Sequence, residues 1–336
     1  MATPSIQSLQ RSAAATGHSL DTLEKAARLL DMLAEISEDP LLAGRLALKG
    51  GTALNVFHLN LDRLSVDIDL NYIGALDREA MQKERPDIED AIARILASKG
   101  YSVRRRPEEH GGGKWVSRYA SALGGNAALE VDVNYMYRQP LFGTARMESA
   151  DLGEIRASDI LVLDIHEIIA GKIVALLSRR TVRDLFDAQR ILSIDRLDWN
   201  RIKTAVIAFG ACGRIDWRDV SINDITTPED SPKKLLYCLP QDHPLNSKNF
   251  DAWVQKAISD CRQHFAFLFD LSAGEQAFLD GVLDHGEINP HLLDNADSDT
   301  QTRIGAMPML AWKAMHVRKH QQVYGSTPTG GKPAPK

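Results

Sequence analysis

Two aspartates one residue apart, set in an otherwise apolar strand, constrain the fold more than any other feature of the chain. The stretch LSVDIDLNYIG, residues 64–74, alternates between apolar and polar residues as a β-strand does. Strand side chains alternate between two faces, so Asp67 and Asp69 share one face and the apolar residues take the other. Two like charges this close repel each other unless a cation lies between them. We expect a divalent cation there, Mg²⁺ in the first place; the alternative is an exposed edge strand with solvated acids.

A Gly-Gly-Thr turn lies upstream of this strand. RLALKGG, residues 45–51, predicts a short buried strand that stops at two glycines, and TALNVFHLNL then resumes helical spacing. Gly50 and Gly51 allow close backbone approach, and the free amide groups at the start of the helix, beside Thr52, form an anion site. Such a site suits a triphosphate; the alternative for a Gly-Gly pair is a simple turn.

A third acidic candidate comes from LEVDVNY, within the strand predicted for residues 126–137. Asp132 would complete a metal-binding triad with the aspartate pair, or act as general base for an attacking hydroxyl. Glu130 shares its face and is the other candidate, with Asp132 preferred. The alternative is that Asp132 is a strand-end acid paired with Arg104 or Arg106.

The order of predicted elements gives an α+β fold with a mixed sheet flanked by helices. Helical spacing occurs at residues 19–37 and 77–100, the second interrupted at Pro86, and strand-like segments alternate with these helices. After about residue 150 most segments have helical spacing. The predicted division is an α/β N-terminal half, a mostly helical C-terminal half and a disordered tail: residues 1–150, 151–320 and 321–336.

Composition limits the class of protein. The 336 residues are 44 % hydrophobic and 25 % charged, which is ordinary for a globular protein long enough for two domains. A net charge of −5 excludes a generally basic protein that coats nucleic acid, but is compatible with a local basic groove. The three cysteines form no CxxC pair and fit a reducing cytosol. With no apolar run of membrane-spanning length and no signal-peptide core, we expect a cytoplasmic protein without a membrane span.

Two motifs resemble those of a known family. LKGGTAL followed by RLSVDIDL is similar to the opening motif of the DNA polymerase β-type nucleotidyltransferase superfamily, in the form found in the AbiEii toxins, which include the MenT toxins. EIIAGKIVALLSRRTVRDLFDAQRIL resembles the later motif of that family, a helix with a lysine, then an arginine, then Arg-Asp-x-x-Asp. The resemblance covers about residues 45–192 and implies a nucleotidyltransferase domain, to which the helical half contributes the later motif.

In the first motif the resemblance implies roles position by position. Asp67 and Asp69 match the metal-binding pair. Ser65 matches a Ser or Thr beside these acids that, in some relatives, is phosphorylated, which silences the enzyme. The phosphate-cradling turn corresponds to Gly50, Gly51 and Thr52.

In the second motif Lys172 matches the helix lysine that neutralises nucleotide phosphates, although a lysine beside an apolar stripe is often only a surface residue. Asp184 and Asp187 match the Arg-Asp-x-x-Asp acids, and either could face the site. Many relatives have a basic residue or Gly-Lys before Arg-Asp, where this chain has Arg-Arg-Thr-Val. The sequence therefore does not decide which of Arg179, Arg180 and Arg183 faces the nucleotide. Arg183 and Asp184 could equally be a helix-start ion pair.

Metal-bound acids, a triphosphate turn and a lysine are the groups that nucleotidyl transfer requires. For the acceptor, residues 101–125 bring basic and aromatic side chains together on predicted strands, which suits RNA phosphates and unstacked bases or, alternatively, is an ordinary solvated strand. These residues are Arg104, Arg105, Arg106, Lys114, Trp115, Arg118 and Tyr119. HVRKHQQ near the C-terminus is a second, weaker candidate.

The resemblance implies the toxin of a toxin–antitoxin system, which transfers NMP from an NTP to RNA, at the 3′ end of tRNA, with Mg²⁺, and which a cognate antitoxin neutralises. One alternative is an enzyme of this fold that modifies a protein hydroxyl or a small molecule. Another is a non-enzymatic nucleotide-binding module, against which stand four intact residues: Asp67, Asp69, Asp132 and Lys172.

Overall fold

The computed structural model describes residues 4–59, 63–106 and 112–324, with only the backbone of residues 105, 106 and 324. Its centre is a seven-stranded mixed sheet in the order β3-β4-β5-β2-β1-β7-β6. β2 is parallel to β5 and β1 to β7, and the other neighbours are antiparallel. The strands are Leu46–Leu48 (β1), Asp67–Tyr72 (β2), Ser102–Arg106 (β3), Gly112–Ala120 (β4), Asn126–Asn134 (β5), Thr144–Met147 (β6) and Ile160–Leu163 (β7). The predicted α+β fold with a mixed sheet is confirmed.

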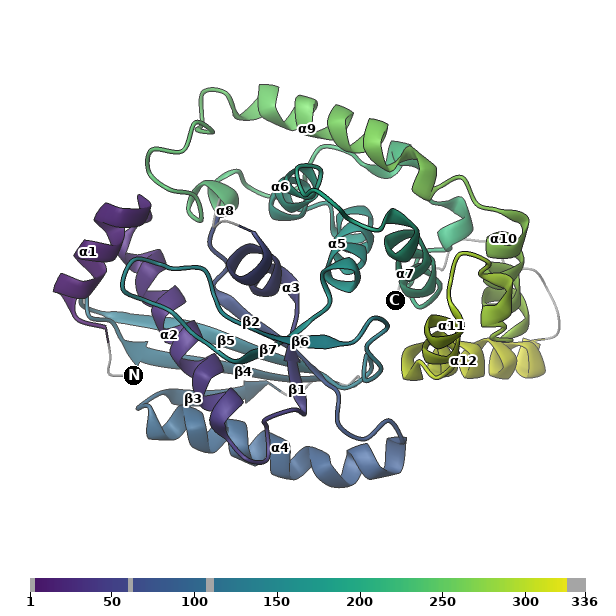
Figure 1. Cartoon of the computed structure of the whole chain (residues 1–336), viewed down its shortest axis with the longest axis horizontal. Helices are drawn as coiled ribbons and strands as arrows, with labels where there is room; N and C mark the ends of the chain where they lie inside the picture. Colours follow the sequence, from purple (N-terminus) through teal and green to yellow (C-terminus); the bar gives the residue numbers. More distant parts are fainter. Residues whose placement is uncertain (1–3, 60–62, 107–111, 325–336) are drawn as a thin grey trace.

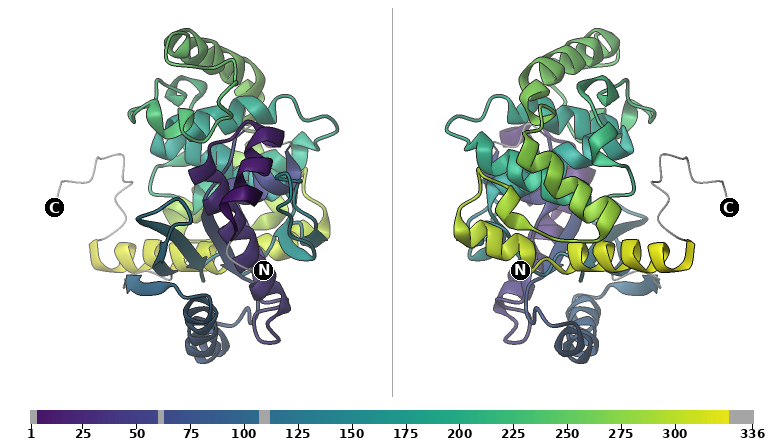
Figure 2. Two further views of the ribbon diagram at one scale, coloured as in Figure 1. Left: turned by 90° about the vertical axis from the view of Figure 1, so that its left-hand side faces the viewer. Right: turned by 90° about the vertical axis from the view of Figure 1, so that its right-hand side faces the viewer.

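Helices cover both faces of this sheet. α4 lies below it in Figure 1, and α3, α5 and α6 lie above. The end-on views show α4 and α9 at opposite extremes of the molecule (Figure 2). The α-helices of the described residues are Ile6–Thr16 (α1), Leu20–Glu38 (α2), Gly50–Thr52 (α3), Arg78–Ser98 (α4), Ile165–Arg179 (α5), Val182–Ile191 (α6), Trp199–Ala211 (α7), Lys233–Leu236 (α8), Phe250–Phe265 (α9), Ala273–Asp280 (α10), Ser298–Gly305 (α11) and Pro308–Tyr324 (α12). Two π-helical turns are described, Ala53–His58 (η1) and Gly281–His285 (η5). The described 3₁₀ turns are Trp217–Asp219 (η2), Ile222–Asp224 (η3), Ala266–Leu268 (η4) and Pro290–Leu292 (η6).

At β2, β4 and β5 the lower face of the sheet is the more deeply buried one. Ile68 of β2, Val131 of β5 and Trp115 of β4 are all 0–1 % exposed. Against this face the guanidinium of Arg28 on α2 lies 4.0 Å from the ring centroid of Tyr119, and α4 contributes the guanidinium of Arg85. Strand alternation therefore leaves the charged residues of β2, β4 and β5 on the upper face.

Two predicted boundaries are corrected. Pro86 lies inside α4 without ending it, because Met81 before it and Ile88 after it both stay on the buried stripe of the helix. Across the predicted division near residue 150, β7 of the second half pairs in parallel with β1 of the first half in one sheet. α12 continues to Tyr324, so residues 321–324 are helical, and the rest of the predicted tail, 325–336, lies outside the described residues.

Candidate active site

The Gly-Gly-Thr turn packs directly against the strand with the two aspartates. The backbone N–H of Lys49 donates to the carbonyl of Asp69 (2.9 Å), and the Thr52 hydroxyl donates to the carbonyl of Asp67 (2.6 Å). Gly50 has φ +72°, and a Cβ added there would lie 3.1 Å from Cβ and Cγ of Asp69. A Cβ on Gly51 would lie 2.9 Å from Oγ of Ser65. Any larger residue at either position would separate the turn from the acids.

Parallel pairing of β2 with β5 brings four carboxylates to the same face. Asp67 is in register with Glu130, and Asp69 with Asp132. The side chain of Asp67 is 41 % exposed, so this face is open. Partial burial raises the pKa of Asp67, and the negative charge of Asp69 raises it further. This is the like-charge repulsion expected from the sequence, and a bound cation would relieve it.

The donor set fits Mg²⁺ only with help from a ligand. Within the described residues no group of three or more His, Cys, Asp or Glu side chains is arranged to hold a metal ion. Asp132 lies in register beside Asp69, and its place in a metal-binding triad with Asp67 and Asp69 stays a prediction. Mg²⁺ commonly takes one or two protein carboxylates and fills its other positions with water and substrate phosphate oxygens. Two aspartates beside the Gly-Gly turn match that pattern.

The second motif forms a buried ionic network beside this site. Asp187 is 0 % exposed, and its two oxygens accept from Nε and Nη2 of Arg63 at 2.7 Å each. Lys172 Nζ lies 2.7 Å from Asp187 Oδ2, and Asn55 Nδ2 donates to Asp187 Oδ1 at 3.2 Å. Burial alone would raise the pKa of Asp187, but the charges of Arg63 and Lys172 outweigh it and hold the pKa well below its ordinary value. Lys172 is thus an internal residue held by acids, and the surface alternative is wrong.

Asp184 has a different role from Asp187. It accepts a hydrogen bond from the hydroxyl of Thr181, the N-cap of α6, at 2.7 Å. Arg179 reaches it at 3.1 Å and Lys172 at 3.5 Å. Asp184 therefore joins the ends of α5 and α6, whereas Asp187 connects α6 to the segment before β2.

Among the arginines left open by the sequence, Arg183 is the one that contacts the aspartate pair. Its Nη1 lies 3.8 Å from Oδ2 of Asp67. Arg180 ends α5 with φ +49° and reaches Glu229 at 3.4 Å. The helix-start pair of Arg183 with Asp184, which the sequence left as an alternative, is not among the contacts recorded for the described residues.

Sequence reasoning missed Arg63 and Asn55. Arg63 is 2 % exposed, and a Cβ on Gly51 would lie 3.2 Å from its Nη2, so it touches both motifs. The sequence feature that indicated Arg63 is the motif RLSVDID, in which this arginine stands two residues before Ser65 in a segment that must be buried. Ser65 is itself only 5 % exposed.

The aromatic part of the predicted RNA-binding strand is wrong. Trp115 and Tyr119 are 1 % and 5 % exposed, because their register places them on the buried face. Arg104 and Arg118 are exposed, and Lys114 forms a 2.7 Å ion pair with Glu130. The side chains of Arg105 and Arg106 lie outside the described residues.

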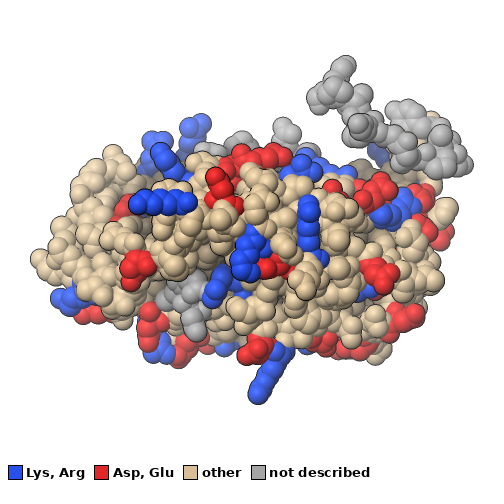
Figure 3. Space-filling view, turned by 90° about the horizontal axis from the view of Figure 1, so that it is seen from above, with Lys and Arg blue, Asp and Glu red and all other residues tan. Residues whose placement is uncertain are grey.

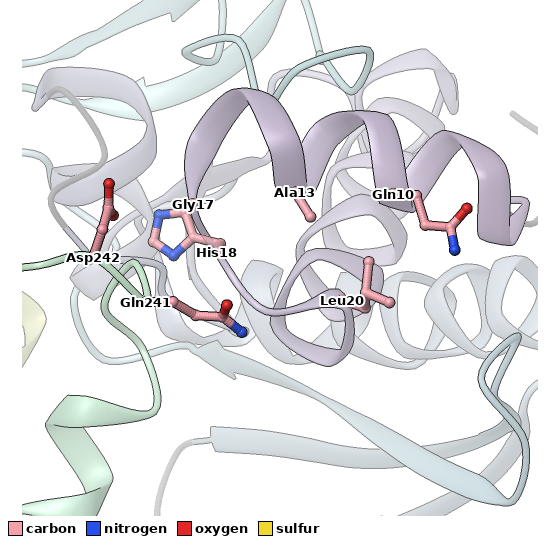
Figure 4. A pocket seen from close by; sticks show the side chains of 7 residues that line it. All are labelled: Gln10, Ala13, Gly17, His18, Leu20, Gln241 and Asp242. Carbon is pink, nitrogen blue, oxygen red and sulfur yellow. The ribbon is translucent and has the colours of Figure 1, made fainter.

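A separate cavity of about 480 Å³ lies between the α1–α2 connection and the loop before α9 (Figure 4). None of the predicted site residues lines it. Its walls are formed by Gln10, Ala13, Gly17, His18, Leu20, Gln241 and Asp242.

A mixed sheet whose Asp-x-Asp strand packs against a Gly-Gly turn defines a nucleotidyltransferase-type fold. The family model of the nucleotidyl transferase AbiEii toxins of type IV toxin–antitoxin systems matches residues 31–314, and the chain belongs to that family. Among solved structures it is similar to MenT4, a nucleotidyltransferase toxin from Mycobacterium tuberculosis H37Rv. The TM-score is 0.58 at 17 % identity, over 90 % of this chain and 97 % of that one, which shows the shared fold. A search of curated proteins finds no match. Among the described helices, none is long and apolar enough to cross a membrane.

Proposed function

We propose that the protein transfers a nucleoside monophosphate from an NTP to an RNA hydroxyl, at the 3′ end of tRNA, in a Mg²⁺-dependent reaction. The observation on which this rests most is the close packing of the Gly-Gly turn on Asp69, which brings the backbone of the turn next to the aspartate pair. A triphosphate on the turn would lie next to Asp67 and Asp69, whose mutual repulsion a cation would relieve.

The residues of the chain divide the work. The backbone amides of Gly50, Gly51 and Thr52 would hold the triphosphate, since the Thr52 side chain is already bonded to Asp67. Asp67 and Asp69 would hold Mg²⁺, which when bound neutralises phosphate charge and polarises the α-phosphate.

On the other side of the pair, Asp132 would accept the proton of the attacking hydroxyl. Arg183, 3.8 Å from Asp67, would offset charge on the departing pyrophosphate. Lys172 with its partners Asp184 and Asp187 would position this region, and Ser65 and Arg179 would complete the surroundings of the nucleotide. As the toxin of its system, the protein would be neutralised by a cognate antitoxin and would act in the cytoplasm.

The test is incubation of the purified protein with Mg²⁺, each α-labelled NTP in turn and total tRNA. We expect label on tRNA with one preferred nucleotide, and no label after chelation or with Asp67→Asn. Asp195→Asn, at an exposed aspartate outside the site, is the matched control and should label normally. Label on protein instead of tRNA would move the acceptor to a polypeptide. Full labelling by a folded Asp67→Asn variant would show that the aspartate pair is not the metal site.

A further inference from the structure

The upper face of the sheet continues beyond the four carboxylates to an open edge. β3 is the first strand of the sheet, so no further strand covers its outer side within the described chain. Strand register gives one cross-strand row from Asp67 through Glu130 and Val116 to Arg104. The next row contains Asp69, Asp132 and Lys114. Residues in register share a face, so acids and basic groups lie side by side.

The basic end of this face is uncovered. Arg104 and Arg118 are exposed, and so are their small neighbours Ser102 and Ala128 in the adjoining row. On the opposite face of the same strands Trp115 is buried beneath helices. We call Arg104, Arg118 and the partly buried Lys114 the basic ledge.

The charges of the ledge are only partly used inside the molecule. Lys114 pairs with Glu130 at 2.7 Å. For Arg104 and Arg118 the described residues provide no ion-pair partner. The wider surface seen from above mixes both signs without a continuous basic field (Figure 3).

The order of the strands separates two phosphate-binding regions. The Gly-Gly turn follows β1, on one side of the Asp67 strand, and the ledge lies on β4 and β3, on the other. Neighbouring strands are about 4.8 Å apart, so Arg104 is about 14 Å from Asp67 along its row. A stacked single strand rises about 3.4 Å per phosphate, so about four nucleotides would fit in that distance.

We propose that the basic ledge binds the backbone of the RNA acceptor, holding the last few phosphates before the 3′ hydroxyl that is presented to the carboxylates. This rests on the proposed function. The triphosphate approaches from the β1 side and the acceptor from the β3 side, and the acids lie between them. Because the aromatic residues of these strands are buried, the ledge contacts phosphates and does not stack on bases.

The experiment compares Arg104→Gln/Arg118→Gln with a control of equal charge change, Lys83→Gln/Arg94→Gln, at exposed positions of α4 on the opposite side of the sheet. Binding of fluorescently labelled total tRNA is measured between 50 and 200 mM salt, without NTP. The slope of log K against log salt is negative, and each lost phosphate contact reduces its magnitude by about 0.7. The slope of the ledge variant should therefore be shallower than that of the wild type by about 1.4. Its binding deficit should then shrink about sevenfold over this salt range. The control should keep the wild-type slope.

A second readout assigns the ledge to acceptor or donor. Affinity for each NTP with Mg²⁺ should be the same in the ledge variant and the wild-type protein, while KM for tRNA rises and kcat is retained. An unchanged salt slope would overturn the proposal, and an equal loss of NTP affinity would assign the ledge to the triphosphate. If the wild-type protein binds tRNA through the ledge but transfers no nucleotide to it, the proposed reaction fails and the binding surface stands.

Discussion

Replacing Asp187 with asparagine removes one negative charge from the buried network while keeping the shape of the side chain. In the native protein this carboxylate accepts hydrogen bonds from Nε and Nη2 of Arg63 and forms an ion pair with Nζ of Lys172, at 2.7 Å each. An asparagine has one acceptor oxygen, so its NH₂ group would face a donor. The segment before β2 and helix α6 would then be linked by a mismatched contact.

The magnitude follows from burial. Arg63 and Asp187 are 2 % and 0 % exposed, so solvent cannot replace the lost charge. Removing one partner of a buried ion pair costs about 3–5 kcal/mol, because the other charge remains buried without compensation. Lys172 keeps Asp184 at 3.5 Å, which offsets part of the loss. We therefore expect a destabilisation of about 3 kcal/mol, at the lower end of that range.

The assay is urea unfolding of the wild type, Asp187→Asn, Arg63→Gln and the double variant, followed by circular dichroism. Most of the lost unfolding free energy comes from the buried Arg63 charge that is left without a partner. Asp187→Asn should therefore destabilise the protein far less when Arg63 is already replaced by glutamine. Additive effects within about 0.5 kcal/mol would refute this reasoning. So would a loss below about 1 kcal/mol for Asp187→Asn alone. Loss of transfer in an Asp187 variant should therefore be interpreted together with its stability.

Four further predictions follow from the same contacts. Asp67→Asn should abolish transfer yet unfold at the same or a higher temperature, because the raised pKa shows that folding disfavours this charge. Thr52→Val should cost about 1–3 kcal/mol in urea unfolding, since the carbonyl of Asp67 loses its donor. Burial raises the pKa of Glu167 to about 8, although backbone amides of residues 141 and 142 donate to it. The folded state thus keeps a proton that the unfolded chain releases, so stability should fall as pH rises from about 4.5 to 8. Glu167→Gln should flatten that fall in melting temperature measured across the same pH range. Saturation with Mg²⁺ and the preferred NTP at 100 times Kd should add about 2.7 kcal/mol of stability, which chelation removes.

The aspartate pair and the turn could be predicted because their geometry is local. Alternation in a strand places Asp67 and Asp69 on one face wherever the strand lies in the protein. The glycines at 50 and 51 mark a close backbone approach, and the structure supplies Asp69 as the group that approaches. Helical spacing likewise predicted α2 and α4, because apolar periodicity is set by residues a few positions apart.

Partner choice depended on the tertiary structure. Trp115 looked available to RNA in the sequence, but which face of β4 is buried depends on α2 and α4, which come from elsewhere in the chain. Lys172 looked like a ligand for phosphate, and only the packing of α5 against α6 shows that two acids already hold it.

The sequence by itself determined the strand with its paired acids, the Gly-Gly turn and the family motifs, since each is contained in a short segment. Only the tertiary structure decided that Arg63 joins Asp187 and that β7 completes the sheet beside β1. It also decided that the basic residues of β3 and β4 share a face with the acids. These are contacts between residues tens of positions apart or more, and no local periodicity specifies which of many compatible partners a buried charge or a strand edge will meet.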